Sequence, residues 1–215
     1  MANHVYFNIE IEGLTEEQHN CLFKSEVVKR PHWREGEDPI EYNEFCDIHE
    51  QPFMSNVERT YDKDGWIEDS YMWYVNNCGA KWVSVDEWDY PRLQGYSAWS
   101  HPVQLVEHLL EYASQRFNVE TSAIMTYEDE FRNFIGRDLF ETSPNEEGNW
   151  YCLHSEEYID GGDLNAMLED KLNCDLSSDD FDWWDEYKDT GIVPQEWLDE
   201  VVYNFFDTGE LNGEI

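Results

Sequence analysis

Apolar and polar residues alternate over residues 5–11, near the start of the chain. This two-residue period is typical of a strand with one buried face. Thr15 and Gln18 then form a capping-box pattern ahead of spaced apolar residues, which predicts a helix over about 16–28.

From residue 29 to residue 65 prolines, a glycine and charges interrupt any period. We expect this part to be a long, loop-rich insertion with little regular structure, of a kind that is often functional.

Two strands, a turn and a strong helix are predicted next. Residues 70–76 and 82–88 are rich in aromatic and β-branched side chains, which suit a sheet, and the Asn-Asn-Cys-Gly sequence at 76–79 suits the turn. A short strand around 95–99 runs into Pro102, a residue favoured in the first turn of a helix. The clearest amphipathic helix follows, with apolar residues at three- and four-residue spacing: Val106, Leu109, Leu110, Ala113 and Phe117.

Residues 122–127 and 150–154 are the last predicted strands, the second after a turn at 144–148. The order of strand, helix, strands, helix and strands indicates the α+β class, with helices on one face of an antiparallel sheet. The predicted topology is a split βαβ, ferredoxin-like arrangement.

The C-terminal part differs from the rest of the chain. Asp163 is placed to cap one helix and Pro194 to open another. We therefore divide the chain into an α+β domain over residues 1–155 and an acidic, mainly helical appendage over residues 156–215.

Carboxylates dominate the composition. The chain has 49 Asp and Glu against 13 Lys and Arg, a net charge of −36 on 215 residues, and repulsion on this scale disfavours the compact state. Residues 156–215 hold 19 acids and two lysines, a net charge of −17, whereas residues 1–155 hold 30 acids and 11 bases, a net charge of −19. The charge is densest in the appendage. A factor other than folding must therefore favour this negative charge, such as a cationic protein surface, a metal ion or saline solvent.

Composition also excludes several classes of function. The 10 Trp, 13 Tyr and 11 Phe predict a folded chain despite the charge. So few bases exclude direct binding to nucleic acid or to an anionic membrane. The chain has no apolar run of membrane-spanning length and no basic start followed by an apolar run. We therefore expect a soluble cytoplasmic protein with five reduced cysteines.

Two short motifs carry a family resemblance. The sequences Trp73–Trp82 (WYVNNCGAKW) and Gly95–Pro102 (GYSAWSHP) resemble the paired Asn-Trp-Gly-Thr-Lys-Trp and Thr-Ala-Trp-Ser-Pro-Pro signatures of the YubB-type ferredoxin-like domain. That family is carried mainly by bacterial plasmids and phages. Cys78, Ala80 and His101 depart from the signatures.

The resemblance follows the order of elements over about residues 5–154. It implies a ferredoxin-like sandwich of mobile-element origin and supplies no catalytic residues. We interpret the motif as structural, with a glycine that permits a turn and aromatic residues that pack the sheet against a helix. The motif residues are Cys78, Gly79, Lys81, Trp82 and Trp99.

Candidate catalytic and metal-binding motifs are weak. Cys46 with His49, and Cys152 with His154, bring a thiol near an imidazole, but neither pair has the doubled spacing of a zinc motif. The Asp62–Gly65 sequence resembles the opening of a calcium loop but lacks the later bidentate Glu, so a turn is predicted. No phosphate-binding loop or nucleophile elbow occurs. We therefore expect no enzyme activity, no metal and no cofactor.

The acidic appendage interleaves carboxylates with aromatic residues. A polar run is usually a solvated face, but solubility needs no exposed Trp pair, whereas a binding surface uses aromatic anchors within a charged rim. The predicted partner-binding residues are Asp175, Asp179, Asp180, Asp182, Trp183, Trp184, Asp185, Glu186, Asp189, Glu196, Asp199 and Glu200.

Three functions are compatible with these patterns. The first is a phage or plasmid interaction protein that imitates nucleic-acid phosphates and occupies the basic groove of a host DNA- or RNA-binding enzyme, as an anti-defence or host-takeover factor. At one charge per about 1.7 Å of duplex, the excess charge corresponds to about 60 Å of DNA. The second is a carboxylate-rich enzyme that depends on a divalent metal, and the third is an acid-adapted accessory protein without such a target. The sequence fixes neither the target nor the oligomeric state, and a homodimer is one arrangement it allows.

Overall fold

The computed structural model describes residues 3–31, 38–130 and 134–160, together with residues 166, 169, 170 and 173. The elements follow the chain in the order β1 (His4–Glu12), α1 (Glu16–Asn20), β2 (Ser25–Arg30), β3 (Ile40–Phe45), the 3₁₀ turns η1 (Ile48–Glu50) and η2 (Pro52–Met54), α2 (Ser70–Cys78), β4 (Lys81–Asp89), β5 (Arg92–Ala98), α3 (Val103–Phe117), β6 (Ser122–Asp129), β7 (Phe134–Pro144) and β8 (Trp150–Asp160). The predicted α+β class is confirmed for this part of the chain.

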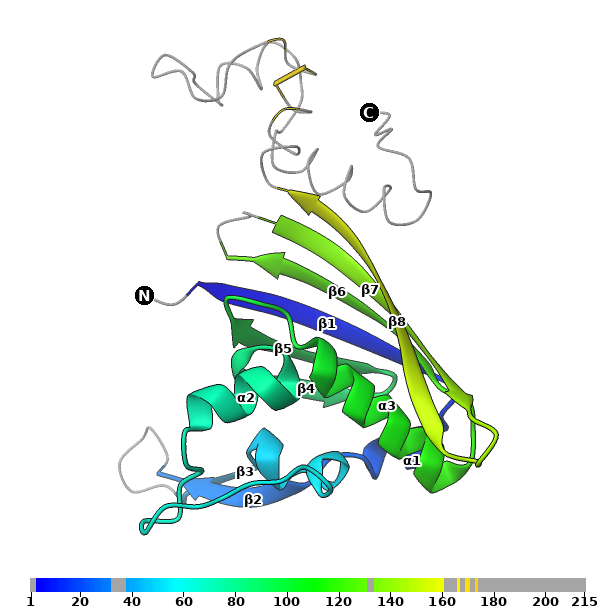
Figure 1. The fold of residues 1–215 in the computed structure, drawn as a ribbon. Helices are drawn as coiled ribbons and strands as arrows, with labels where there is room; N and C mark the ends of the chain where they lie inside the picture. Colours follow the sequence, from blue (N-terminus) through cyan, green and yellow to red (C-terminus); the bar gives the residue numbers. More distant parts are fainter. Residues whose placement is uncertain are drawn as a thin grey trace.

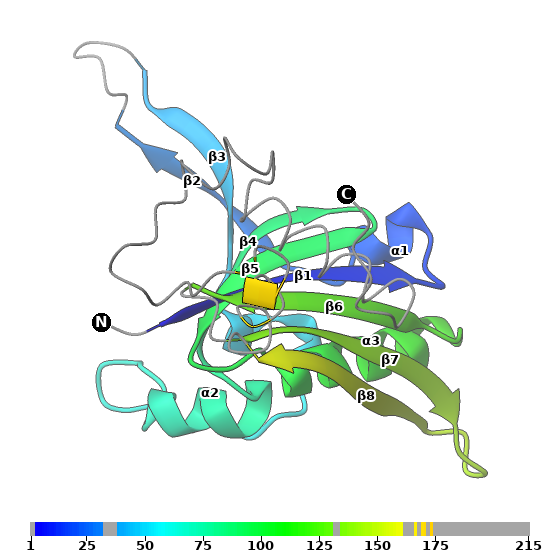
Figure 2. The same cartoon turned by 90° about the horizontal axis from the view of Figure 1, so that it is seen from above.

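Six strands form one antiparallel sheet in the order β4-β5-β1-β6-β7-β8, seen side by side in Figure 2. β1 lies between β5 and β6, and its Phe7 pairs with Gly95 on one side and with Tyr127 on the other. β7 and β8 form a long hairpin in which Asp138 pairs with Glu156. This register decides which side chains of β6, β7 and β8 meet.

Helices α2 and α3 cover one face of the six-stranded sheet (Figure 1). The alternation in β1 places Val5 and Ile9, both fully buried, in the core with Leu105 and Leu109 of α3. Burying such a side chain contributes about 1.5–3 kcal/mol relative to leaving it exposed. The first predicted strand and the predicted amphipathic helix are therefore confirmed, and each has the apolar face that its period indicates.

Three buried hydroxyls join α3 to the sheet. Ser114 Oγ lies 2.8 Å from both Thr121 Oγ1 and Thr142 Oγ1, and Thr142 Oγ1 accepts a hydrogen bond of 2.8 Å from the Thr121 backbone N–H. Because each hydroxyl has a partner, the helix buries polar atoms without leaving them unpaired. The contact fixes α3 against the start of β6 and the end of β7.

The helix predicted over 16–28 is wrong beyond residue 20. Its capping box exists, since Thr15 Oγ1 accepts from the Gln18 backbone N–H and Gln18 Oε1 accepts from the Thr15 backbone N–H, but α1 ends at Asn20. Residues 25–30 form β2, which pairs with β3. The β-branched Val27 and Val28 suit that hairpin, and the partner strand decides the conformation.

The strand predicted over 70–76 is also wrong, because Ser70–Cys78 form helix α2. The helix ends where Gly79 adopts a φ of 84° and donates its backbone N–H to the Val75 carbonyl. Trp73 is buried on the inner side of α2, and its Nε1 donates to the Glu58 carbonyl at 3.0 Å. Aromatic content favours a strand only where neighbouring strands are available, and here tertiary packing decides.

The sequence pattern missed β7 altogether. Its inward positions alternate correctly, but they hold Gly136, Asp138, Phe140 and Thr142, of which only Phe140 is a large apolar residue. A search for alternating apolar residues therefore does not reveal the two-residue period of β7. The predicted strands over 82–88, 95–99, 122–127 and 150–154 are confirmed as β4, β5, β6 and β8.

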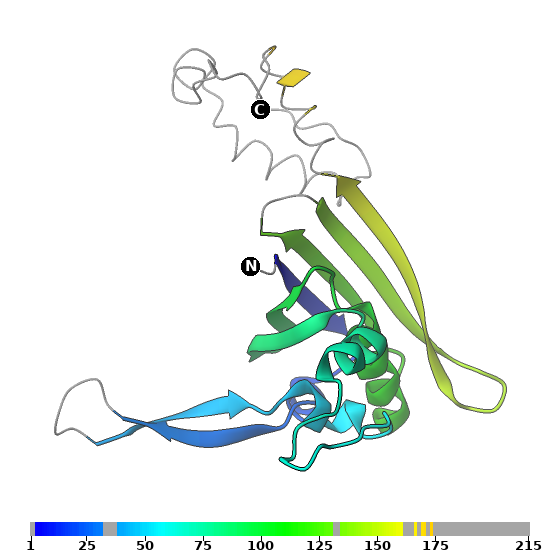
Figure 3. The same cartoon turned by 60° about the vertical axis from the view of Figure 1, so that its left-hand side comes forward.

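The segment from residue 29 to residue 65 has more regular structure than expected. It contains the end of β2, all of β3 and both 3₁₀ turns, and the β2–β3 hairpin projects away from the six-stranded sheet (Figure 3). β8 continues to Asp160, past the predicted domain boundary at residue 155. Residues 166, 169 and 170, in the first helix predicted for the appendage, are helical, but the rest of both predicted helices lies outside the described residues. The separation of the appendage as a second domain stays a prediction.

Candidate functional site

Five polar and aromatic side chains meet on the covered face of the sheet, and we call them the histidine–carboxylate cluster: His101, Tyr127, Asp138, His154 and Glu156. His101 lies in the connection between β5 and α3, directly before Pro102 at the helix start. The other four come from β6, β7 and β8, where Tyr127 pairs with Gly136, Asp138 with Glu156, and Phe140 with His154. Residues two apart on a strand share a face, so the register brings these side chains together.

The Asp138 carboxylate is the centre of the cluster. Its side chain is 0% exposed, and its Oδ2 lies 3.1 Å from His101 Nε2 and 3.0 Å from His154 Nε2. Glu156 Oε1 lies 3.9 Å from His101 Nε2. Despite these short distances, neither oxygen of Asp138 accepts a well-directed hydrogen bond among the described residues. His101 Nε2 makes no well-directed hydrogen bond there either. Three potential ligand atoms, from His101, Asp138 and Glu156, therefore lie within 4.8 Å of one another, and His154 Nε2 contacts the same Asp138 oxygen.

Aromatic stacking holds both imidazoles in place. The His101 ring lies on the Tyr127 ring with centroids 3.7 Å apart, and the His154 ring lies on the Phe140 ring with centroids 4.8 Å apart. Tyr127 Oη donates a 2.9 Å hydrogen bond to Glu156 Oε1. Burial, and then the negative charge of Asp138, raise the pKa of Tyr127, so the phenol keeps its proton.

The predicted structural motif forms a second feature, the lysine–aromatic cluster: Tyr71, Lys81, Trp82 and Trp99. Lys81 is buried, and its Nζ lies 3.2 Å from the centroid of the Trp99 ring, 4.8 Å from that of Trp82 and 5.1 Å from that of Tyr71. No carboxylate pairs with this ammonium group among the described residues, so the rings take that role by cation–π attraction.

The two tryptophans do not pack the sheet against a helix, which corrects the interpretation from the sequence. Trp82 is 54% exposed and Trp99 is 61% exposed. Both have positive φ angles, 52° and 71°, which bulky residues rarely adopt. Both side chains are therefore exposed to solvent and are carried by backbone in the left-handed region.

The positive φ predicted for the motif glycine is confirmed. Gly79, at φ 84°, ends α2, and a Cβ there would lie 2.1 Å from Gln104 Oε1. Cys78 is fully buried, and burial raises the pKa of its thiol, so it acts as a small apolar residue.

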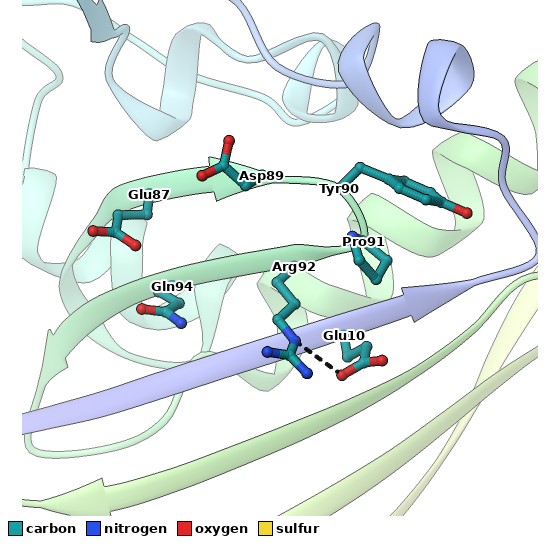
Figure 4. Close-up of a pocket in the computed structure, with 7 residues that line it drawn as sticks. All are labelled: Glu10, Glu87, Asp89, Tyr90, Pro91, Arg92 and Gln94. Atoms are coloured by element: carbon teal, nitrogen blue, oxygen red, sulfur yellow. Dashed lines mark hydrogen bonds and ion pairs between the residues drawn. The ribbon is translucent and has the colours of Figure 1, made fainter.

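An acidic hollow lies on the other side of the sheet, near the β4–β5 turn (Figure 4). It has a volume of about 340 Å³, and Glu87 and Asp89 of β4 and Glu10 of β1 contribute its carboxylates. Arg92 Nε donates to Glu10 Oε2 at 3.1 Å. With three carboxylates and one guanidinium, the hollow has a net charge of −2 and suits a cationic group.

The remaining sequence candidates have simple outcomes. Asp62 Oδ1 accepts from the backbone N–H groups of Asp64 and Trp66, so the predicted turn is confirmed there. Cys46 and His49 form no group of three metal-ligating side chains among the described residues. His154 belongs to the histidine–carboxylate cluster, whereas burial raises the pKa of the Cys152 thiol to about 12 and that thiol donates to the Leu153 carbonyl at 3.7 Å.

The predicted partner-binding residues, from Asp175 to Glu200, all lie outside the described residues. The sequence did not predict the histidine–carboxylate cluster, because its members come from four separate segments. The sequence signals were His101, where the resembling family has proline, and His154, which was considered only together with Cys152.

No protein-family model matches this chain, and comparison with curated proteins and with solved structures gives no match. The YubB-type resemblance therefore rests on its two motifs and stays a prediction. Among the described residues, no helix has both the length and the apolar character needed to cross a bilayer.

Proposed function

We propose that this chain is an acidic interaction protein that imitates nucleic-acid phosphates and binds the basic groove of a host DNA- or RNA-binding protein. We place it in the cytoplasm of a bacterium that carries a phage or plasmid, as a binding protein rather than an enzyme. The observation that supports this most directly is the use of its cations: several cations of the described residues are engaged within the chain, and 49 Asp and Glu against 13 Lys and Arg leave most carboxylates without a cation to pair with.

Five cations of the described residues pair with carboxylates, namely Lys24, Lys29, Arg30, Lys63 and Arg92. Arg59 donates to the carbonyls of His49 and Met54, and Arg116 donates to Tyr112 Oη. A polyphosphate needs several free cations side by side, and these groups do not form such a surface. The arrangement supports a partner that is itself cationic.

Exposed carboxylates lie on the edge strand β4 and in the acidic hollow. Asp86, Glu87 and Asp89 all lie on the surface of β4. Residues two apart on a strand are separated by about 6.8 Å, so Glu87 and Asp89 form a short row of charges. Charges on an edge strand also prevent pairing with another sheet, which is the simpler role for them.

The lysine–aromatic cluster supplies the kind of anchor that a charged surface lacks. Exposed Trp and Tyr side chains dominate the energy of many protein interfaces. Trp82 and Trp99 stand on the surface with Lys81 between them. We assign them the apolar contact of the interface and assign the carboxylates the long-range attraction.

The finer topology is part of the same proposal. Strands β4-β5-β1-β6, with α2 between β1 and β4 and α3 between β5 and β6, follow the order of a ferredoxin-like domain. β7 and β8 extend that sheet by two strands. This order supports the resemblance to the YubB-type family of plasmids and phages.

Displacement of bound DNA tests the proposal. A labelled duplex is bound to each of several purified bacterial DNA-binding proteins, among them a nucleoid protein, a restriction enzyme and a recombination nuclease, and its fluorescence anisotropy is followed as this chain is added. We expect displacement from at least one protein, weakened by salt, with no binding of the duplex to this chain itself. Direct binding of the chain to the duplex would refute the proposal. Failure to displace DNA from every protein of the panel, at low salt as well, would also count against it.

A further inference from the structure

We infer that the histidine–carboxylate cluster is a binding site for one divalent transition-metal ion of the zinc class. Its ligands are His101 Nε2, Asp138 Oδ2 and Glu156 Oε1, whose atoms already lie close together, and His154 Nε2, now in contact with Asp138 Oδ2, joins them as a fourth ligand by a side-chain movement. The inference goes beyond the proposed function and does not depend on it.

The spacing of the ligand atoms supports this site. Tetrahedral zinc binds nitrogen and oxygen at about 2.0–2.2 Å, which places neighbouring ligand atoms about 3.3 Å apart. Asp138 Oδ2 lies 3.1 Å and 3.0 Å from the two imidazole nitrogens, and Glu156 Oε1 lies 3.9 Å from His101 Nε2. The ligand atoms of His101, Asp138 and Glu156 all lie within 4.8 Å of one another. An ion between these three atoms needs only small side-chain adjustments, whereas His154 lies outside this compact group and reaches the ion by a larger movement of its side chain.

The unsatisfied atoms are a second, independent observation. A fully buried carboxylate is costly, and among the described residues two imidazoles, both at Oδ2, approach that of Asp138. Its Oδ1 has no hydrogen-bond partner there, and the contact of His101 Nε2 with Oδ2 is not a well-directed hydrogen bond. A divalent cation neutralises the two carboxylates and uses the lone pairs of two neutral imidazoles at once. It therefore removes the cost at each of these atoms.

The surroundings of the ligands resemble those of metal sites. Groups behind metal ligands usually fix their orientation through hydrogen bonds. Tyr127 Oη donates to Glu156 Oε1 at 2.9 Å and also stacks on His101, so one side chain orients two ligands. Gly136 gives the phenol its space, because a Cβ there would lie 2.2 Å from Tyr127 Cζ.

The donor atoms select the class of metal. Calcium takes six to eight oxygen ligands and magnesium keeps several waters, so neither favours a site with two imidazoles. Imidazole with carboxylate suits zinc and other first-row transition metals. This preference separates the site from the weak attraction that any carboxylate-rich surface has for divalent cations.

Calorimetric titration of the chelator-treated, full-length protein with zinc chloride tests the inference, in a large excess of magnesium that occupies oxygen-only sites. We expect one zinc ion per chain, confirmed by metal analysis after gel filtration, and a rise in melting temperature. Glu156→Gln should weaken zinc binding at least tenfold. The Glu156 side chain is half exposed, so this substitution should leave folding intact. His101→Gln and Asp138→Asn should weaken zinc binding further, with folding checked by circular dichroism.

Two control variants separate this site from other zinc ligands in the chain. His49→Gln removes a histidine outside the cluster, and Cys152→Ser removes the nearest thiol on β8. Both should bind zinc like the parent. The inference is overturned if the parent binds no zinc at one equivalent, if Glu156→Gln and His101→Gln both bind it like the parent, or if Cys152→Ser abolishes binding.

Discussion

The ring of His101 lies flat on the ring of Tyr127, with centroids 3.7 Å apart and planes inclined by 8°. His101 belongs to the connection between β5 and α3, whereas Tyr127 belongs to β6. The stacking is therefore a direct contact between the residues before α3 and strand β6. Its geometry depends on a third residue, because Tyr127 crosses β7 at Gly136, where no side chain blocks it.

Gly136→Ala should therefore destabilise the protein by about 1–3 kcal/mol, the usual cost of overpacking. The new methyl group would lie 2.2 Å from Tyr127 Cζ and Oη, and the ring, stacked on His101, has no free space to move into. Urea unfolding followed by circular dichroism measures the loss. Glu141→Ala, at an exposed position of the same strand, is the matched control and should change the free energy of unfolding by less than about 0.5 kcal/mol. Equal stability of Gly136→Ala and the parent would show that Tyr127 is not confined as described.

The contrast between β1 and β7 explains how much of the fold the sequence predicted. In β1 the inward positions are Val5, Phe7, Ile9 and Ile11, so the period appears directly in the sequence. In β7 the inward positions include Gly136 and Asp138, which serve the histidine–carboxylate cluster rather than the core. The residues that make the candidate site are thus the ones that hide its strand. Strand order and side-chain clusters arise from contacts between distant segments, which local patterns do not encode.

Helix α2 shows a second reason why local patterns fail. Its aromatic residues satisfy strand propensity, but Trp73 finds its hydrogen-bond partner in Glu58 and Gly79 ends the helix. The same glycine was correctly predicted to need a positive φ, although at a helix end rather than in a hairpin. The backbone requirement of Gly79 was therefore more predictable than the element around it, whereas the positive φ angles of Trp82 and Trp99 were not predicted.

Stability should fall at mildly acidic pH because of His19. Its ring is fully buried and stacks on Trp88 with centroids 3.8 Å apart, and its nitrogens have no hydrogen-bond partner among the described residues. Burial lowers the pKa of His19 below its ordinary value of 6.5, although Asn20 and Asp89 oppose this. The unfolded chain then binds a proton more readily than the folded chain. The contribution of neutral His19 to the free energy of unfolding is complete above pH 6.5. It is lost as the pH falls below 6.5 toward the lower pKa that His19 has in the folded state.

Urea unfolding of the parent and of His19→Phe at pH 7.5 and pH 5.5 checks this, since phenylalanine keeps the stacking and removes the titration. The parent should lose more stability than His19→Phe between the two pH values. The comparison is needed because protonation of surface carboxylates relieves repulsion in both proteins. An identical pH dependence would mean that His19 keeps its ordinary pKa in the fold.

Trp82→Gly and Trp99→Gly should separate stability from partner binding. Glycine relieves a left-handed backbone by about 1–2 kcal/mol, which offsets the lost cation–π contact with Lys81, worth about 0.5–2 kcal/mol. The free energy of unfolding should stay within about 1 kcal/mol of the parent. Displacement of DNA from the responsive protein should nevertheless weaken at least fivefold for each variant, as expected for an interface anchor.

Trp66→Ala is the matched control, because Trp66 is 71% exposed and lies outside the lysine–aromatic cluster. It should displace DNA like the parent. If all three variants displace DNA equally well, the lysine–aromatic cluster is not the anchor. If the glycine variants unfold at much lower urea concentrations, the two rings support the fold instead.

Neutralising the appendage should slow association with the target. The substitutions Asp179→Asn, Asp180→Asn, Asp182→Asn, Asp185→Asn and Glu186→Gln remove five negative charges, and they relieve like-charge repulsion rather than adding to it, so folding should be intact. Long-range attraction depends on the summed field, and the association rate measured by stopped flow should fall at least tenfold at low salt. Added salt should reduce the parent's rate in the same way, given a Debye length of about 8 Å at physiological ionic strength.

The control for this experiment changes the net charge equally but elsewhere. Neutralising Glu16, Glu17, Glu120, Glu146 and Glu147, all exposed and all outside the appendage, removes the same number of charges. If the appendage binds the target, its variant should associate more slowly than this control, because nearby charges contribute most to the field at the binding surface. Equal rates for the two variants would mean that only the total charge matters. Unchanged rates in the appendage variant would refute its role as a phosphate mimic and shift the contact to the described part of the chain, where the acidic hollow and the lysine–aromatic cluster lie.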